Sequence, residues 1–297
     1  MAAVTKYECQ VDPASIDALD IHVHVEIGSD GRSSLPGPLA EAASKYFKAD
    51  GPRPDVDAIA DYYRERRMAA VVFTVDAKHG LDHEPIPSTE VAEGAARHAD
   101  VLIPFGSVDP HRADALDRVK RLIEDYGVRG FKFHPTVQNF DPSEERWYPL
   151  YDAMQAAGVV ALFHTGQTGI GAGTPGGSGL RIGLSRPVLL EPVAADFPQL
   201  QVVMAHPSVP WQDEALAIAV HKSNVWIDLS GWSPKYFPKE LVRYANTMLK
   251  DRVLFGTDFP LLTPERWLRD IDTTDLKDEV RPSILRDNAV RLLRLTS

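Results

Sequence analysis

Cysteine is nearly absent from this chain, and it also lacks an excess of basic residues and long apolar runs. The single cysteine, Cys9, among 297 residues excludes a disulfide within the chain and a zinc site built from several thiolates. Acidic residues number 42 against 32 basic ones, giving a formal net charge of −10, which argues against a nucleic-acid-binding face. No apolar run reaches the length of a membrane span and no secretory signal opens the chain. We therefore expect a cytoplasmic protein whose partners include neither nucleic acid nor membrane.

Short apolar strands alternate with helical patterns from residue 17 onward, which is typical of an α/β fold. We predict eight strands, at 18–24, 69–75, 101–108, 128–134, 159–164, 201–206, 224–229 and 253–258. Helices are predicted at 55–68, 112–126, 143–157, 186–197, 211–222, 238–249 and 279–295, with a further one beginning at Ser88. No linker or change of composition divides the chain. The pattern predicts one (β/α)8 TIM barrel domain over 1–297, with long loops at 25–54 and 166–183 after strands one and five. An open doubly wound sheet is the alternative, but no Gly-rich nucleotide turn follows strand one.

Histidine and aspartate gather where the predicted strands end. Side chains alternate along a strand, so His22 and His24 face one way, with Asp20 on their side. Later strands end at Asp76, Asp109, Lys132, His134, His164, His206, Asp228 and Asp258. An isolated His-x-His pair is more often two unrelated histidines. Here five of the ten histidines lie at strand ends, which is the edge of a (β/α)8 barrel that carries its active site.

Imidazole nitrogens and carboxylate oxygens are the ligands of a divalent metal, most suitably Zn²⁺, with Mn²⁺ or Fe²⁺ as alternatives. Three or four of the strand-end groups suffice to hold one such ion. A catalytic zinc lowers the pKa of its bound water to about 7, and the remaining groups are then free to move protons.

The combination of His22-Val23-His24, His164, His206 and the segment 256–260 (Gly-Thr-Asp-Phe-Pro) resembles the amidohydrolase superfamily. Within it, the chain is most similar to the amidohydrolase-related branch that contains aminocarboxymuconate-semialdehyde decarboxylase, and the similarity continues through residues 288–293. The resemblance implies one metal held by His22, His24, His164 and Asp258, with Asp258 also taking part in catalysis. It implies that His206 activates the metal-bound water or moves a proton. Members of this branch are often homodimers.

Six further residues are candidates for substrate contact. Binuclear members of the superfamily carry a carboxylated lysine on strand four, so Lys132 is a substrate contact, a bridging carbamate or part of a structural ion pair. His134 shares its face and contacts either substrate or a neighbouring ligand. Trp232 stacks on a substrate ring or packs under a loop. Arg181, like Arg186 and Lys48, is a candidate contact for an anionic substrate group.

Two reactions fit this set of residues. The first is hydrolysis by a metal-activated water, with an aryl β-ketoacyl-CoA thioester cleaved at a carbon–carbon bond during aromatic catabolism as the substrate that overall similarity favours. The second is non-oxidative decarboxylation of an aromatic or muconate-type acid by a carboxy-lyase. A barrel that only binds a ligand, or a metal-free lactonase, fits less well because the complete histidine and aspartate set is retained.

Overall fold

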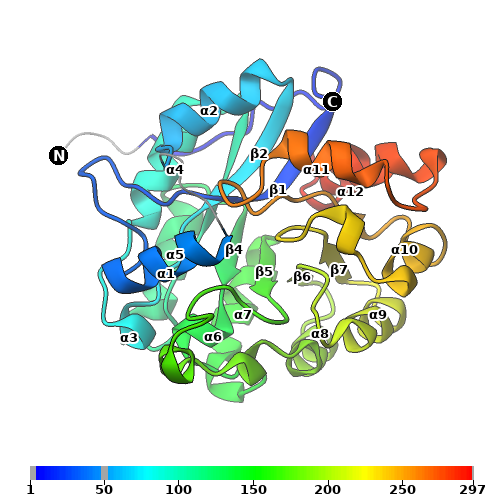
Figure 1. The fold of residues 1–297 in the computed structure, drawn as a ribbon. Coiled ribbons are helices and arrows are strands. Elements are labelled where there is room, and N and C mark those ends of the chain that lie inside the picture. The colour runs from blue at the N-terminus through cyan, green and yellow to red at the C-terminus, as the bar shows by residue number, and fades with distance from the viewer. Residues whose placement is uncertain (1–4, 48–52, 296–297) are drawn as a thin grey trace.

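Eight parallel strands form a barrel in the computed structural model, which describes residues 5–47 and 53–295. The strands are hydrogen-bonded in chain order and helices surround them (Figure 1). They are β1 (Ala18–His24), β2 (Met68–Phe73), β3 (Leu102–Gly106), β4 (Gly130–Phe133), β5 (Val160–His164), β6 (Gln201–Ala205), β7 (Val225–Asp228) and β8 (Val253–Leu254). All eight predicted strands are present, and the predicted (β/α)8 barrel is confirmed. Lys48, a candidate anion contact, lies outside the described residues.

The chain that follows β8 joins it to β1. The backbone N–H of Ile21 donates to the carbonyl of Phe255 at 3.1 Å, and that of Asp258 donates to the carbonyl of His22 at 2.9 Å. β8 is shorter than the predicted 253–258 because the backbone leaves the extended region, and Asp258 has a φ of 68°. This junction sets Asp258 beside the two histidines of β1.

Apolar side chains form an inner and an outer layer on the two sides of the strands. The inner cluster fills the barrel and includes Leu19, Ile21 and Phe73. The outer cluster packs the opposite strand faces against the helices and includes Val23 and Val72. Strands covered on both sides read as continuous apolar runs, which is why they were readable in the sequence.

A β-bulge in β1 changes which side chains face the barrel. Between Asp20 and Val23, β1 advances three residues while β2 advances two, from Ala70 to Val72. The extra residue reverses the alternation of side chains beyond it. Asp20 therefore faces the outer layer, where it accepts a hydrogen bond from the Tyr63 hydroxyl at 2.6 Å. The expectation that Asp20 shares the side of the histidines is wrong for this reason.

Nine helices cover the outside of the barrel in the described chain: α2 (Val56–Glu65), α4 (Ser88–Arg97), α5 (Ala115–Glu124), α7 (Tyr148–Ala157), α8 (Glu191–Asp196), α9 (Gln212–His221), α10 (Lys239–Ala245), α11 (Pro264–Ile271) and α12 (Asn288–Leu292). Three others follow strand ends: α1 (Gly37–Phe47), α3 (Lys78–Leu81) and α6 (Pro135–Gln138). Within the described ranges, no helix combines the length and the apolar character needed to cross a membrane.

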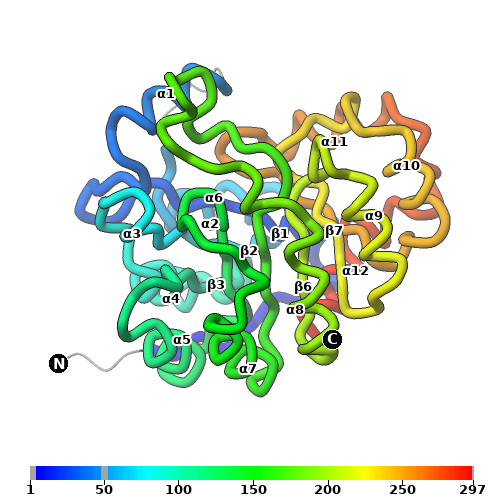
Figure 2. Tube along the Cα trace, turned by 90° about the horizontal axis from the view of Figure 1, so that it is seen from below, coloured from blue at the N-terminus to red at the C-terminus, as the bar shows by residue number. Residues whose placement is uncertain are grey.

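The helices depart from the sequence pattern in several places. α1 occupies part of the predicted 25–54 loop, and α11 and the short helices α3 and α6 were not predicted. The predicted helix 279–295 is interrupted by a π turn at Ser283–Asp287 before α12. The first half of the predicted helix 186–197 is a 3₁₀ turn, Pro187–Leu190, because Pro187 and Pro192 remove backbone donors. Figure 2 shows α1 and the loop after β5 together at one end of the barrel.

Candidate metal centre

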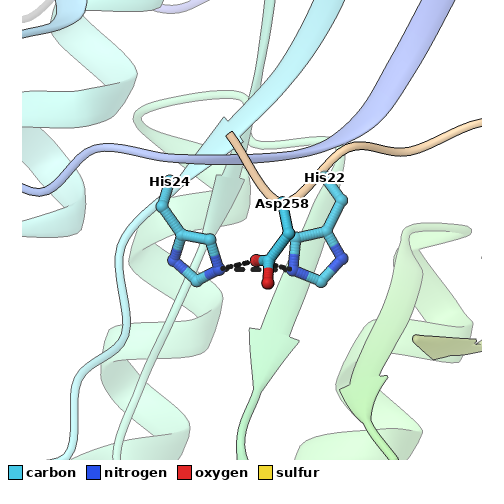
Figure 3. Close-up of side chains that lie close together, drawn as sticks. All are labelled: His22, His24 and Asp258. Carbon is cyan, nitrogen blue, oxygen red and sulfur yellow. Dashed lines mark hydrogen bonds and ion pairs between the residues drawn. The ribbon is translucent and has the colours of Figure 1, made fainter. Parts of the chain in front are cut away.

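Three of the predicted metal ligands meet at the end of β1. Nε2 of His22 lies 3.3 Å from Oδ1 of Asp258, and Nε2 of His24 lies 3.0 Å from the same oxygen (Figure 3). The two Nε2 atoms are 3.2 Å apart. The ligand atoms of all three residues lie within 4.8 Å of one another. Two strand ends that are far apart in the sequence thus supply one cluster of donors.

Asp228, at the end of β7, holds His22 from behind. Its Oδ2 accepts from Nδ1 of His22 at 2.6 Å and from the Ser230 hydroxyl at 2.8 Å, and its Oδ1 accepts from the Ser230 backbone N–H at 2.8 Å. Burial acts to raise the pKa of Asp228, but the charge and hydrogen bond of His22 hold that pKa below its ordinary value. Because an ionised carboxylate only accepts, Nδ1 of His22 carries a proton, and in the neutral imidazole that would bind a metal the lone pair is on Nε2.

His206, after β6, is oriented in the same way. Its Nδ1 lies 3.0 Å from the carbonyl oxygen of Ser230, so Nδ1 donates, and its Nε2 lies 2.9 Å from Nδ1 of His164. Burial lowers the pKa of His206 to about 4, so the imidazole is neutral at neutral pH and Nε2 accepts the proton of His164. Nε2 of His164 is then a buried lone pair with no hydrogen-bond partner among the described residues.

This set of donors fits a divalent metal. Burial lowers the pKa of His24 to about 4 and the pKa of His164 well below its usual range, which leaves both imidazoles neutral and able to bind a cation. Neutral imidazoles combined with one carboxylate are ligands for zinc, manganese or iron. His164 lies outside the cluster of three, but its unpartnered Nε2 is the kind of atom that a fourth ligand presents.

Glycine makes room for the centre at two places. A Cβ on Gly231, whose φ is +74°, would lie 2.6 Å from Nδ1 of His206 and 3.2 Å from Oδ2 of Asp258. A Cβ on Gly256 would lie 2.2 Å from Oδ1 of Asp228. Real Cβ atoms do not approach that closely. A larger residue at position 231 would therefore displace His206, and one at position 256 would displace Asp228, which supports His22.

Lys132 and His134 lie beside the centre, as their strand-four placement predicts. Nζ of Lys132 is 3.1 Å from Nε2 of His22, and burial lowers the pKa of Lys132 to about 8. Within the described chain, Nζ of Lys132 therefore has an imidazole and not a carboxylate as its hydrogen-bond partner. This contact differs from the structural ion pair that was one of the three predictions for Lys132. The ring of His134 stacks on that of His164, with centroids 3.8 Å apart and planes 9° apart. Burial lowers the pKa of His134 well below its usual range, so this imidazole is also neutral.

The other acidic strand ends serve the loops. Asp76 binds the Arg112 guanidinium at 2.6 and 2.8 Å. Asp109 accepts from the backbone N–H groups of His79 at 2.6 Å and His111 at 3.0 Å. These carboxylates stabilise the loops after β2 and β3 and do not join the centre.

A cavity of about 550 Å³ opens over the centre. Its lining includes His24, Lys132, His134, His164, His206, Trp232 and Asp258. Trp232 therefore lies where a substrate contact was predicted. Arg181 is exposed and is not among the lining residues, so the structure does not bring it to the cavity.

Sequence reasoning missed four residues that shape the site. Glu26 and Arg53 form an ion pair at 2.7 Å in the cavity wall, and both lie in the segment predicted as a loop. Ser230 and Gly231 follow β7 and support His206. The signal for the second pair was available, since Ser-Gly two residues after the strand-end Asp228 marks a turn at the active edge of the barrel.

Comparison with known proteins agrees with this geometry. Residues 19–295 match the sequence model of the family described as amidohydrolase. The chain belongs to the amidohydrolase family. No match was found among curated proteins.

Solved structures that share the fold of this amidohydrolase-family chain include the following three. An uncharacterized TIM-barrel protein from Bordetella bronchiseptica is 21% identical, with a TM-score of 0.74 over 93% of this chain and 98% of that chain. A dihydroxybenzoic acid decarboxylase from Polaromonas, with bound manganese and the inhibitor 2-nitroresorcinol, is 16% identical, with a TM-score of 0.64 over 94% and 97%. A probable 2-pyrone-4,6-dicarboxylic acid hydrolase from Acinetobacter baumannii is 14% identical, with a TM-score of 0.61 over 94% and 100%. Decarboxylases of aromatic acids outnumber hydrolases among the named similar structures.

Proposed function

We propose that this amidohydrolase-family protein is a metal-dependent decarboxylase that releases CO₂ from an aromatic acid. The observation that carries the proposal is the cluster of His22, His24 and Asp258 at the base of a cavity, with neutral His206 beside it. The number of aromatic-acid decarboxylases among structures of the same fold supports this reaction over hydrolysis.

His22, His24, Asp258 and His164 are the residues that would hold the metal. When bound, a divalent cation supplies positive charge that orients an acid substrate and stabilises negative charge as the carboxyl group departs. The histidine-rich set favours zinc, and the manganese in a dihydroxybenzoic acid decarboxylase of the same fold supports manganese as the other candidate.

His206 is the group that we assign to the proton. In decarboxylation the bond between the ring carbon and the carboxyl carbon breaks, and its electron pair stays on the ring carbon. That carbon then takes up one proton, so the acid anion and a proton give the arene and CO₂. For this step the hydrogen bond from Nδ1 of His164 opens, so that Nε2 of neutral His206 accepts a proton from a substrate hydroxyl or from water and delivers it to the ring carbon. Lys132, His134 and Trp232 line the cavity and are proposed to contact the substrate.

Hydrolysis by a metal-activated water remains the second candidate, because the probable 2-pyrone-4,6-dicarboxylic acid hydrolase has the same fold. The substrate that the sequence favoured, an aryl β-ketoacyl-CoA, has less support, because the similar structures whose names give a substrate are named for aromatic acids or a pyrone. The homodimer and the cytoplasmic location remain predictions from the sequence.

The test is turnover by the metal-free protein reconstituted with Zn²⁺ or Mn²⁺. A panel of hydroxybenzoates, a 2-pyrone dicarboxylate and an aryl β-ketoacyl-CoA is incubated with each form, and released CO₂ and remaining substrate are measured. We expect metal-dependent CO₂ release from at least one hydroxybenzoate. Consumption of the pyrone or the thioester without CO₂ from any acid would overturn the decarboxylase proposal.

A further inference from the structure

The cavity over the metal centre is larger than one aromatic ring requires. A cavity of about 150 Å³ lined by apolar side chains holds a benzene molecule. The cavity here measures about 550 Å³. One ring placed at the centre therefore leaves more than half of the space for another part of the substrate.

The surface of the cavity as a whole is more apolar than polar. Beside polar residues such as Ser34, Ser44 and Gln167, the segments around α1, the loop after β5 and the turn after β7 contribute six apolar residues: Leu35, Ala40, Ala43, Phe47, Ile170 and Tyr236. We call this set the apolar wall. A Cβ on Gly169 would lie 2.3 Å from the Phe47 ring, so glycine lets the loop after β5 pack directly on α1. These two segments lie together in Figure 2 and make the wall continuous.

Charges near the apolar wall balance one another. Outside the metal centre and its neighbours Lys132 and His134, the charged residues that line the cavity in the described chain are Glu26, Glu41, Arg53 and Arg266. Arg53 pairs with Glu26 at 2.7 Å, and Arg266 lies 3.8 Å from Asp270. Both cations therefore face a carboxylate, while exposed Glu41 adds a negative charge. A second carboxylate or a phosphate on the substrate finds no unpaired cation on this part of the described wall.

We infer that the substrate of this site is an aromatic acid carrying a neutral, apolar substituent of about the size of a second ring, and that the apolar wall binds the substituent. The inference rests on the proposed function, because that function places the carboxyl-bearing ring at the metal. The volume of the cavity gives room for the substituent, the apolar wall favours an apolar one, and the paired charges favour a neutral one.

Binding to the metal-loaded protein tests the subsite without turnover. Phenol, 4-phenylphenol, biphenyl-4-carboxylate and biphenyl-4,4′-dicarboxylate are titrated in a calorimeter. Burying a second ring against the apolar wall is expected to make 4-phenylphenol bind at least about tenfold more tightly than phenol. When one carboxylate of the dicarboxylate binds at the metal, the other lies at the apolar wall, so the dicarboxylate is expected to bind more weakly than biphenyl-4-carboxylate. Equal binding of phenol and 4-phenylphenol, or tighter binding of the dicarboxylate than of the monocarboxylate, would overturn the inference.

Two alanines of α1 provide a matched pair of variants. Ala40 lines the cavity, whereas Ala42, two residues away on the same helix, does not. Ala40→Phe should weaken 4-phenylphenol binding at least about fivefold and leave phenol binding unchanged, because the added ring occupies the subsite. Ala42→Phe should change neither. Ala40→Leu replaces Ala40→Phe if circular dichroism shows that the larger variant does not fold.

The two proposals fail in different ways. If no acid in the panel yields CO₂, the decarboxylase proposal fails, while the binding preference still decides the subsite. If single-ring acids are decarboxylated as efficiently as acids with an apolar second ring, the subsite inference fails and the decarboxylase proposal stands.

Discussion

Asp228→Asn should weaken metal binding, although Asp228 is not one of the predicted metal ligands. The substitution keeps the shape of the side chain but turns one acceptor oxygen into an NH₂ donor. If that NH₂ takes the place of Oδ2, it faces Nδ1–H of His22, which now donates to Oδ2 at 2.6 Å. If it takes the place of Oδ1, it faces the Ser230 backbone N–H, which now lies 2.8 Å from Oδ1. The first conflict is relieved when the His22 proton moves to Nε2, which then cannot bind a metal.

Loss of such a partner behind a metal-binding histidine lowers metal affinity by about 10–100-fold, or about 1.4–2.8 kcal/mol. We expect this range for Asp228→Asn, measured on metal-free protein by competition for Zn²⁺ with a chromophoric chelator. Ser230→Ala keeps the carboxylate and should cost less.

Asp109→Asn is the matched control for this measurement. Asp109 is also a buried strand-end carboxylate, but it accepts from the backbone N–H groups of His79 and His111 and lies outside the donor cluster. Its substitution should lower thermal stability and leave Zn²⁺ affinity unchanged. A folded Asp228→Asn protein that binds Zn²⁺ as tightly as the parent would refute the role given to Asp228.

Three further outcomes are expected. Asp258→Ala should remove one of three clustered ligands and with it the bound metal and CO₂ release, and elemental analysis of the parent should give about one metal per chain, whereas a ratio near two would contradict the single-metal site. Gly231→Ala places a Cβ 2.6 Å from Nδ1 of His206 and should lower kcat at least about tenfold while the metal is retained. Gly173→Ala is the control, because Gly173 also has a positive φ, +77°, but has no atom within 4 Å of the added Cβ. It should cost only about 1–2 kcal/mol of stability and leave kcat unchanged. Burial acts to raise the pKa of Glu265, but bonds from the C-terminal end of α2 lower it to about 2, so its stabilisation is present above the ordinary pKa of 4.5 and is lost as the pH falls toward 2. Glu265→Gln should remove that acid-sensitive part, which is below about 1 kcal/mol because Glu265 is half exposed, and urea unfolding at pH 7 and pH 3 should show a smaller difference for the variant than for the parent.

The strands and three metal ligands were predictable because their signals are local. A buried parallel strand reads as a short apolar run, and the polar residue that ends it faces the active edge of the barrel. His22, His24 and Asp258 each satisfy that rule, so their convergence follows once the strands are counted.

The two longest helices that were not predicted from the sequence, α1 and α11, were missed for different reasons. α1 buries only Ala43 and begins among prolines and glycines, so its sequence lacks a clear apolar face. α11 carried a readable start, since Thr263 precedes Pro264 and its side chain accepts from the Arg266 N–H at 3.4 Å. Strand eight was predicted at 253–258 and no helix was predicted between that strand and residue 279, so the start of α11 was overlooked.

The support of the centre was not predictable from local patterns. The contact of Asp228 with His22 joins residues 206 positions apart, and it depends on which way each strand end turns. The bulge that puts Asp20 on the opposite side from the histidines has no signal in residues 18–24. An unbroken strand with regular alternation fits that sequence equally well.

The bulge in β1 also limits how the His-Val-His motif can be moved or inherited. Copying residues 18–24 onto a regular strand of another barrel, with Leu19 in line with the residues that face its interior, would lose the extra residue between Asp20 and Val23. Both imidazoles would then point toward the helices, although every ligand remained in the sequence. Grafting this site, or judging whether a relative has kept it, therefore requires counting residues back to the start of the first strand as well as matching the histidines.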